Sequence, residues 1–213
     1  MSETLPEVAW WFAASDKLPH GDGRKVIIGK TLRVQPPLRL CARGLHWSIV
    51  PFYALGYAPG PILYKVRPGG GFLIDGDKGC STERTALAVH DATDVLRAFA
   101  RREALSVIHL WVAPKIVRQY LETGDDKIKD TAGNATNTAI YNMAVSTSEI
   151  IVYAARAAWN AITIAQATPT RAATYAIRAA YYAAGSASIG SIAAAKERFN
   201  MLVKELFDTK RED

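Results

Sequence analysis

One segment of the chain places polar side chains between apolar ones, close to a tight turn. The run from Cys41 to Ser48 reads Cys-Ala-Arg-Gly-Leu-His-Trp-Ser, and Tyr57 follows shortly before the turn residue Gly60. The side chains of His46, Ser48 and Tyr57 can each form hydrogen bonds. Rigid backbone around them would hold these groups in fixed positions. The pattern therefore indicates a pocket wall, although it specifies no reaction.

Two other groups of residues could carry chemistry. The residue types that bind zinc occur at Cys41, His46, Cys80 and His90. Their separations of five, thirty-four and ten positions match no paired zinc motif, so we expect no metal site. The run Asp75-Gly76-Asp77-Lys78 could form a carboxylate cluster, but such a run after a strand is more typical of a solvated turn. A lone histidine such as His46 is more often a structural hydrogen-bonding residue than a base.

Two hairpins are predicted among the elements that would position these residues. Residues 8–15 and 25–34 are apolar and rich in strand-forming types, and they flank a glycine-containing turn at residues 19–23. Residues 62–66 and 72–74 form a second pair of short strands, joined by the Pro-Gly-Gly-Gly run that begins at Pro68. We expect both pairs to be β-hairpins.

Helical signals begin at Asp91. The run Asp91-Ala92-Thr93-Asp94 can cap a helix, and apolar residues then recur at helical spacing as far as Trp111. Pro114 suits the first turn of another helix, over 114–123, which Gly124 is expected to end.

The segment from residue 131 to 195 contains 22 alanines. Its charged residues are Glu149, Arg156, Arg171 and Arg178. Alanine favours helix, and Pro169 divides the segment into two similar parts, in which residues 153–159 resemble residues 175–181 at an offset of 22 positions. That offset keeps one stripe of side chains on one helix face. We expect an antiparallel helical pair, and a homo-oligomer that buries the small-residue stripe between residues 144 and 195.

These elements predict an α+β fold. It comprises an N-terminal β-rich module at residues 1–90, connecting helices at 91–124, and an alanine-rich antiparallel helical hairpin at 125–213. Within the β-rich module, residues 38–48 are expected to form a strand and residues 49–58 a short helix with Pro51 in its first turn.

Composition excludes several classes of protein. With 213 residues, 49% hydrophobic and 22% charged, the chain has the make-up of a globular protein. The net charge of +6 is spread along the sequence, which favours a mixed-charge surface and leaves weak, non-specific nucleic-acid binding as an alternative. Two cysteines make no disulfide framework, so we expect a reducing cytoplasm. We expect neither a secretion signal nor a membrane-spanning segment.

The order of motifs along residues 8 to about 195 resembles that of a known group. The motifs are Cys41/Gly44/Leu45/His46/Ser48, Tyr57/Ala58/Gly60, Asp77/Lys78 and Glu83/Arg84/Thr85. In this order they resemble an uncharacterised family encoded by phages, prophages and assorted bacteria. The resemblance implies a phage or prophage setting in a bacterial host, and no mechanism.

A looser resemblance is to ADP-ribosyltransferases. It rests on the order of Gly44 to Ser48, Tyr57, Gly60 and a strand at residues 62–66. The resemblance implies NAD as cofactor, with Gly44 and Tyr57 in its binding site, Tyr57 on the nicotinamide ring and Ser48 on the nearby ribose. Glu83 would be the acid that stabilises the oxocarbenium-like transition state. His46, Ser48, Tyr57 and Glu83 must then converge on one pocket.

Three functions follow as expectations from the sequence. The first is a phage- or prophage-type accessory protein, with a partner-binding module and a helical arm for oligomerisation. The second is an ADP-ribosyltransferase-like enzyme, and the third is a non-specific nucleic-acid binder.

Overall fold

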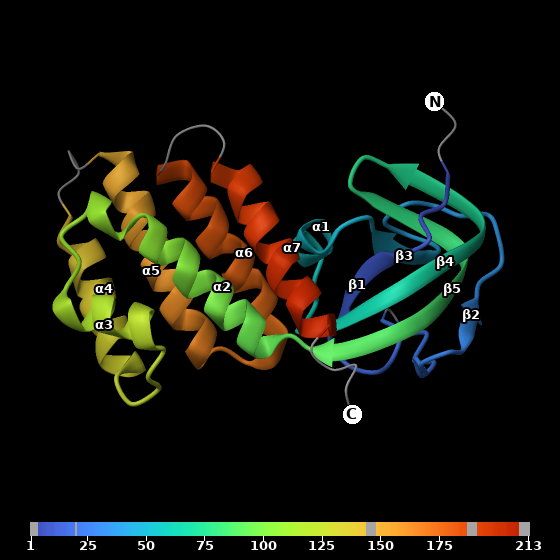
Figure 1. The fold of residues 1–213 in the computed structure, drawn as a ribbon, viewed down its shortest axis with the longest axis horizontal. Helices are drawn as coiled ribbons and strands as arrows, with labels where there is room; N and C mark the ends of the chain where they lie inside the picture. Colours follow the sequence, from blue (N-terminus) through green and yellow to red (C-terminus); the bar gives the residue numbers. More distant parts are fainter. Residues whose placement is uncertain (1–3, 20, 144–147, 187–190, 209–213) are drawn as a thin grey trace. The chain divides into compact units, whose positions relative to one another are not determined.

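A computed structural model describes residues 4–19, 21–143, 148–186 and 191–208, and it confirms the α+β fold (Figure 1). The chain forms two compact units. We call residues 1–92 with 203–213 the β unit, and residues 93–202 the helical unit. No helix within the described ranges has the length and apolar character needed to cross a membrane.

The described part of the β unit contains an antiparallel sheet. Its elements are β1 (Ala9–Ala13), β2 (Thr31–Arg33), β3 (Leu45–Ser48), α1 (Pro51–Gly56), β4 (Ile62–Asp75) and β5 (Lys78–Asp91). The strand order is β2-β5-β3-β1-β4, and β4 also pairs with β5. Because β1, β4, β5 and β3 each pair with two of the others, the sheet closes into a ring (Figure 1). The pair Trp10 and Ser48 makes the closing contact between β1 and β3.

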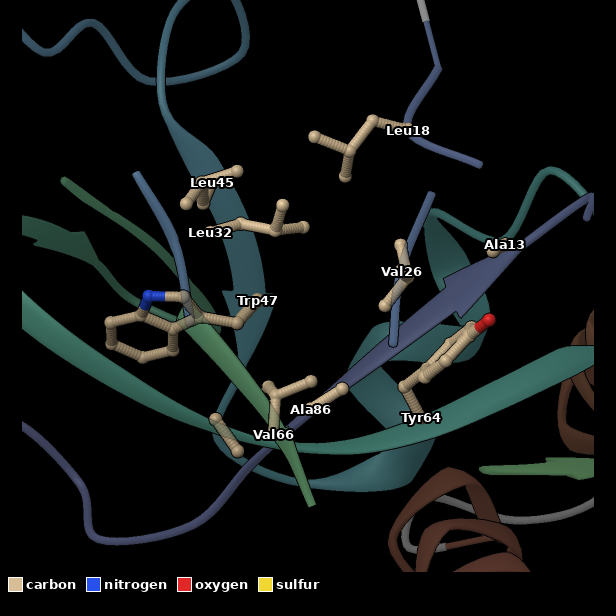
Figure 2. Packing of buried hydrophobic residues seen from close by; sticks show 10 residues of the cluster. Ala13, Leu18, Val26, Leu32, Leu45, Trp47, Tyr64, Val66 and Ala86 are labelled. Atoms are coloured by element: carbon tan, nitrogen blue, oxygen red, sulfur yellow. The ribbon is translucent and has the colours of Figure 1, made fainter. Parts of the chain in front are cut away.

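The core of the β unit is built from inward-facing side chains of these strands. Trp47, Tyr64 and Val66 are at most 2% exposed and lie in one cluster (Figure 2). Gly79 faces Trp47 across the β3–β5 pair, and a Cβ atom at Gly79 would lie 2.4 Å from Cη2 of the Trp47 ring. The absence of a side chain at Gly79 therefore makes room for the indole.

The first predicted hairpin is wrong. β1 pairs with β3 and β4, whereas β2 pairs with β5. The backbone pairing near the predicted turn begins after the first arm: Lys17 bridges Lys25, and the N–H of Val26 donates to the carbonyl of Asp16 over 2.8 Å. His20, in the predicted turn, lies outside the described residues. Strand partners were decided by the closing of the sheet, which local turn residues do not encode.

The second predicted hairpin is also wrong, because β4 runs without interruption through the glycine-rich segment. The register between β4 and β5 shifts between Gly69 and Phe72, so the glycines form a bulge within a long strand. The chain reverses at Gly76 and Asp77. This confirms the interpretation of residues 75–78 as a turn.

The helical unit follows β5. Its elements are α2 (Thr93–Ser106), a 3-10 turn (Ile108–Leu110), α3 (Lys115–Thr123), α4 (Lys129–Tyr141), α5 (Glu149–Gln166), α6 (Pro169–Ser186) and α7 (Ser191–Asp208), whose residues from Val203 belong to the β unit. α2 starts later than predicted because Asp91 still pairs with Ile62 in the sheet. Gly124 adopts a φ of 67° and ends α3, as predicted.

α5 and α6 form the predicted antiparallel pair, with α6 beginning at Pro169 (Figure 1). The rings of Tyr153 and Tyr182 lie 5.9 Å apart, and those of Trp159 and Tyr175 lie 6.2 Å apart. The residue number rises along one helix as it falls along the other, which establishes the antiparallel direction. Many alanines of both helices are at most 3% exposed: Ala154, Ala155, Ala157, Ala158, Ala161, Ala172, Ala173, Ala176, Ala179, Ala180 and Ala183.

Candidate functional site

Several of the singled-out residues meet at the end of β3 and the turn between β4 and β5. We call Cys41, His46, Tyr57, Asp77 and Lys78 the Tyr57 cluster. The segment before β3 folds back on itself, because the backbone N–H of Cys41 donates a hydrogen bond to Nε2 of His46 over 3.0 Å. Cys41 has a φ of 61°, in the left-handed region that residues other than glycine seldom adopt. This fold places the exposed Cys41 thiol near Lys78, and Cys41 contributes to the raised pKa of that amine.

Tyr57 is an exposed aromatic residue held in a defined position. It caps the C-terminal end of α1, and the residue is 53% exposed. Its hydroxyl donates to the Asp77 carboxylate, with distances of 3.0 and 3.1 Å to the two oxygens. The Lys78 Nζ lies 5.4 Å from the centroid of the ring, within range of a cation–π contact. The turn between β4 and β5 thus immobilises the ring from two sides.

Electrostatics in the Tyr57 cluster follow from these contacts. Partial burial, and then the hydrogen bond to Asp77, raise the pKa of the Tyr57 hydroxyl above its usual 10.0. The pKa of Lys78 is also raised, first by Tyr57 and then by Cys41. The cluster therefore presents a neutral phenol and a cationic amine near neutral pH.

Gly44 and Ser48 are closely packed against other parts of the β unit. Gly44 has a φ of 141°, and a Cβ atom there would lie 2.9 Å from Cβ of Cys80 and 3.1 Å from the Leu38 side chain. Ser48 is only 2% exposed and lies opposite Lys78 in the β3–β5 pair. Protein atoms thus occupy the space beside Gly44 and shield Ser48 from solvent.

Glu83 is not brought together with Tyr57. Its Oε1 accepts a hydrogen bond from Nε of Arg33 on β2 over 3.0 Å, and its side chain is 37% exposed. Glu83 lies five residues beyond Lys78 on β5, which corresponds to about 17 Å of extended strand. His46 and Tyr57 therefore lie near one end of the β3–β5 pair, and Glu83 lies farther along β5 beside β2.

Arg84 supports the cluster from inside the β unit. It is 3% exposed, its Nη1 donates to the backbone carbonyl of His46 over 2.5 Å, and its guanidinium carbon lies 3.9 Å from the centroid of a Trp11 ring. Burial lowers the pKa of Arg84 to about 9. Arg84 thus ties β5 to the backbone of His46 and stacks on β1.

Among the described residues, no group of three or more potential metal-binding side chains occurs. Cys80 is buried and Cys41 is exposed, and neither is in a disulfide. The chemical groups of the Tyr57 cluster are a thiol, an imidazole, a phenol, a carboxylate and an amine.

No family model, curated protein or solved structure matches this chain. The Asp-Gly-Asp-Lys run predicted a solvated turn for Asp77 and Lys78, and nothing in it linked them with Tyr57. The sequence feature that could have revealed this site is Gly76, which marks the point where two long strands reverse. Asp77 and Lys78 follow it directly.

Proposed function

We propose that this chain is a partner-binding protein that contacts another protein through the Tyr57 cluster. The observation that supports this most directly is Tyr57 itself, because its large ring is exposed yet held by Asp77 and Lys78. Tyrosines that present a rigid, amphipathic surface contribute strongly to protein interfaces, since little side-chain entropy is lost on binding. The resemblance to a phage-encoded family supports an accessory role in a phage or prophage setting.

The charges of the cluster favour a protein surface over a nucleic acid. Lys78 is accompanied by the Asp77 carboxylate, so the cluster has no surplus of positive charge. A site that follows a phosphate backbone gathers several cations instead. Non-specific nucleic-acid binding remains a prediction from net charge alone.

The ADP-ribosyltransferase alternative has less support from the geometry. That chemistry needs Glu83 beside a nicotinamide ribose that Tyr57 also contacts, but Glu83 pairs with Arg33 and lies away from Tyr57 along β5. NAD titration by calorimetry tests the alternative. Binding that is lost in both Tyr57→Ala and Glu83→Gln would revive it.

Homo-oligomerisation through the alanine-rich helices also remains a prediction. The alanine stripe has a role within one chain, because Ala157 and Ala180 are fully buried. Charged substitutions at these positions would therefore disrupt folding and could not report on association. Exposed residues on the same helices are the informative sites, such as Ile150 and Tyr181, which are 49% and 57% exposed.

A photo-crosslinking amino acid placed at position 57 tests partner binding in the host cell. The matched control places the same amino acid at Tyr141, which is 88% exposed and lies in the helical unit. We expect a discrete crosslinked protein from position 57 and not from position 141. A second substitution, Lys78→Glu, should abolish that product. The proposal fails if position 57 gives no discrete product, or if both positions give the same set.

A further inference from the structure

A second site lies in the helical unit, in a cavity of about 210 Å³ between α4, α5 and α6. Its lining consists of Asn137, Ile140, Arg156, Trp159, Asn160, Arg178 and Tyr182. Two of these residues are arginines and none is acidic. Positions 131–195 contain only four charged residues, and two of them line this one cavity.

The internal repeat explains why the two arginines meet. Arg156 and Arg178 occupy equivalent positions in the two similar halves of the segment. Trp159 on α5 contacts Tyr175 on α6. Arg156 lies three residues before Trp159 on α5, and Arg178 lies three residues after Tyr175 on α6. Because the helices are antiparallel, these two steps run in the same direction in space, and the two arginines lie at the same height along the helix pair. The repeat and the helix direction together therefore produce the paired cations.

Neither arginine is neutralised by the chain. Among the described residues, no acidic group lies within salt-bridge distance of Arg156 or Arg178. The guanidinium carbon of Arg156 lies 5.8 Å from the centroid of the Tyr182 ring. Both arginines are exposed, so their donors are available to a ligand. Arginine donors arranged in a fork suit the oxygens of carboxylates and phosphates.

Asn160 adds an independent sign of a ligand. The residue is 2% exposed, and its Nδ2 donates to the backbone carbonyl of Arg156 over 2.8 Å. Its Oδ1 is buried and has no hydrogen-bond partner among the described residues. Buried polar atoms in folded proteins are nearly always hydrogen-bonded. Asn160 is one of the lining residues, so a hydroxyl group on a ligand in the cavity is a donor that would satisfy this atom.

We propose that this cavity binds a small hydroxylated oxyanion, with Arg156 and Arg178 on the oxyanion and Asn160 on the hydroxyl group. A volume of about 210 Å³ suits a small, metabolite-sized anion. The site is separate from the Tyr57 cluster, so it stands or falls independently of partner binding.

Calorimetry on the full chain tests the proposal with two matched pairs of anions. Malate is compared with succinate, and glycerol phosphate with propyl phosphate, so that each pair differs by hydroxyl groups. We expect the hydroxylated member of at least one pair to bind about fivefold more tightly than its partner, as one neutral hydrogen bond would allow. The pair that binds distinguishes a carboxylate from a phosphate ligand.

Substitutions locate the binding. Arg156→Gln and Arg178→Gln should each weaken binding about tenfold or more, because each removes a charged hydrogen-bonding partner. Arg171→Gln is the control, since Arg171 is an exposed arginine on α6 outside this cavity lining. Asn137→Asp adds a negative charge at an exposed position of the lining and should also weaken binding without disturbing the core. The proposal is overturned if no probe binds at millimolar concentration, or if Arg171→Gln weakens binding as much as the other two.

Discussion

Glu103 and Arg198 form a partly buried ion pair in the helical unit, in which the Arg198 side chain is 30% exposed. Glu103 on α2 is 1% exposed, and Arg198 on α7 donates to both of its oxygens, from Nε and from Nη2, at 2.7 Å each. The hydrogen bonds to Glu103 raise the pKa of Arg198, so the guanidinium stays charged. Arg198→Met keeps much of the side-chain volume but leaves the carboxylate buried without a partner.

The magnitude follows from this geometry. Removing one partner of a buried ion pair costs about 3–5 kcal/mol, because the remaining charge is neither hydrated nor paired. Glu103, the partner that remains in Arg198→Met, is the buried member of this pair. For a chain of this size, each kcal/mol lowers the melting temperature by about 2–4 °C, so Arg198→Met should lower it by about 6–20 °C. The double variant Glu103→Leu with Arg198→Met should recover most of the loss, because no unpaired charge remains.

Urea denaturation followed by far-ultraviolet circular dichroism measures these free energies of unfolding. The control is the exposed pair Arg33 and Glu83, whose side chains are 69% and 37% exposed. Arg33→Met should cost at most about 1 kcal/mol, as is usual for a surface ion pair. The reasoning is refuted if Arg198→Met costs no more than Arg33→Met, or if the double variant is less stable than Arg198→Met alone.

Two further predictions concern the β unit. Gly79→Ala should destabilise the chain by about 1–3 kcal/mol in urea denaturation, because the added methyl group would meet the Trp47 ring at 2.4 Å. Gly56→Ala, where nothing lies within 4 Å of the added atom, is the control and should not destabilise it. The Tyr57 phenol should titrate above pH 10.0, and Asp77→Asn should bring its pKa closer to 10.0, as followed by ring-carbon NMR. The folded state binds the phenol proton more tightly than the unfolded state does. The stability that follows from this difference is therefore complete below pH 10 and decreases as pH rises through the higher pKa of the folded state. A Tyr57 pKa that is unchanged by Asp77→Asn would contradict the assigned hydrogen bond.

Local signals in the sequence were sufficient for several elements. Gly124 ends α3 because a helix commonly stops at a residue with positive φ, which glycine adopts without strain. The alanine-rich segment forms an antiparallel pair that turns before Pro169, because alanine favours helix and proline begins a new one. The turn at residues 75–78 likewise follows from its own composition. In each of these places, the residues that determine the structure are neighbours in the chain.

Tertiary structure decided the partners of strands and of charged groups. The glycines after Pro68 could form a turn or a bulge, and pairing with β5 on both sides selected the bulge. The sequence offered Glu83 as a candidate catalytic acid, but Arg33, fifty residues earlier, is its partner in the structure. The repeat that contains Arg156 and Arg178 is visible in the sequence, whereas the cavity between them depends on α4 packing beside α5 and α6. Contacts between distant residues depend on how the whole chain closes, and no local pattern encodes that.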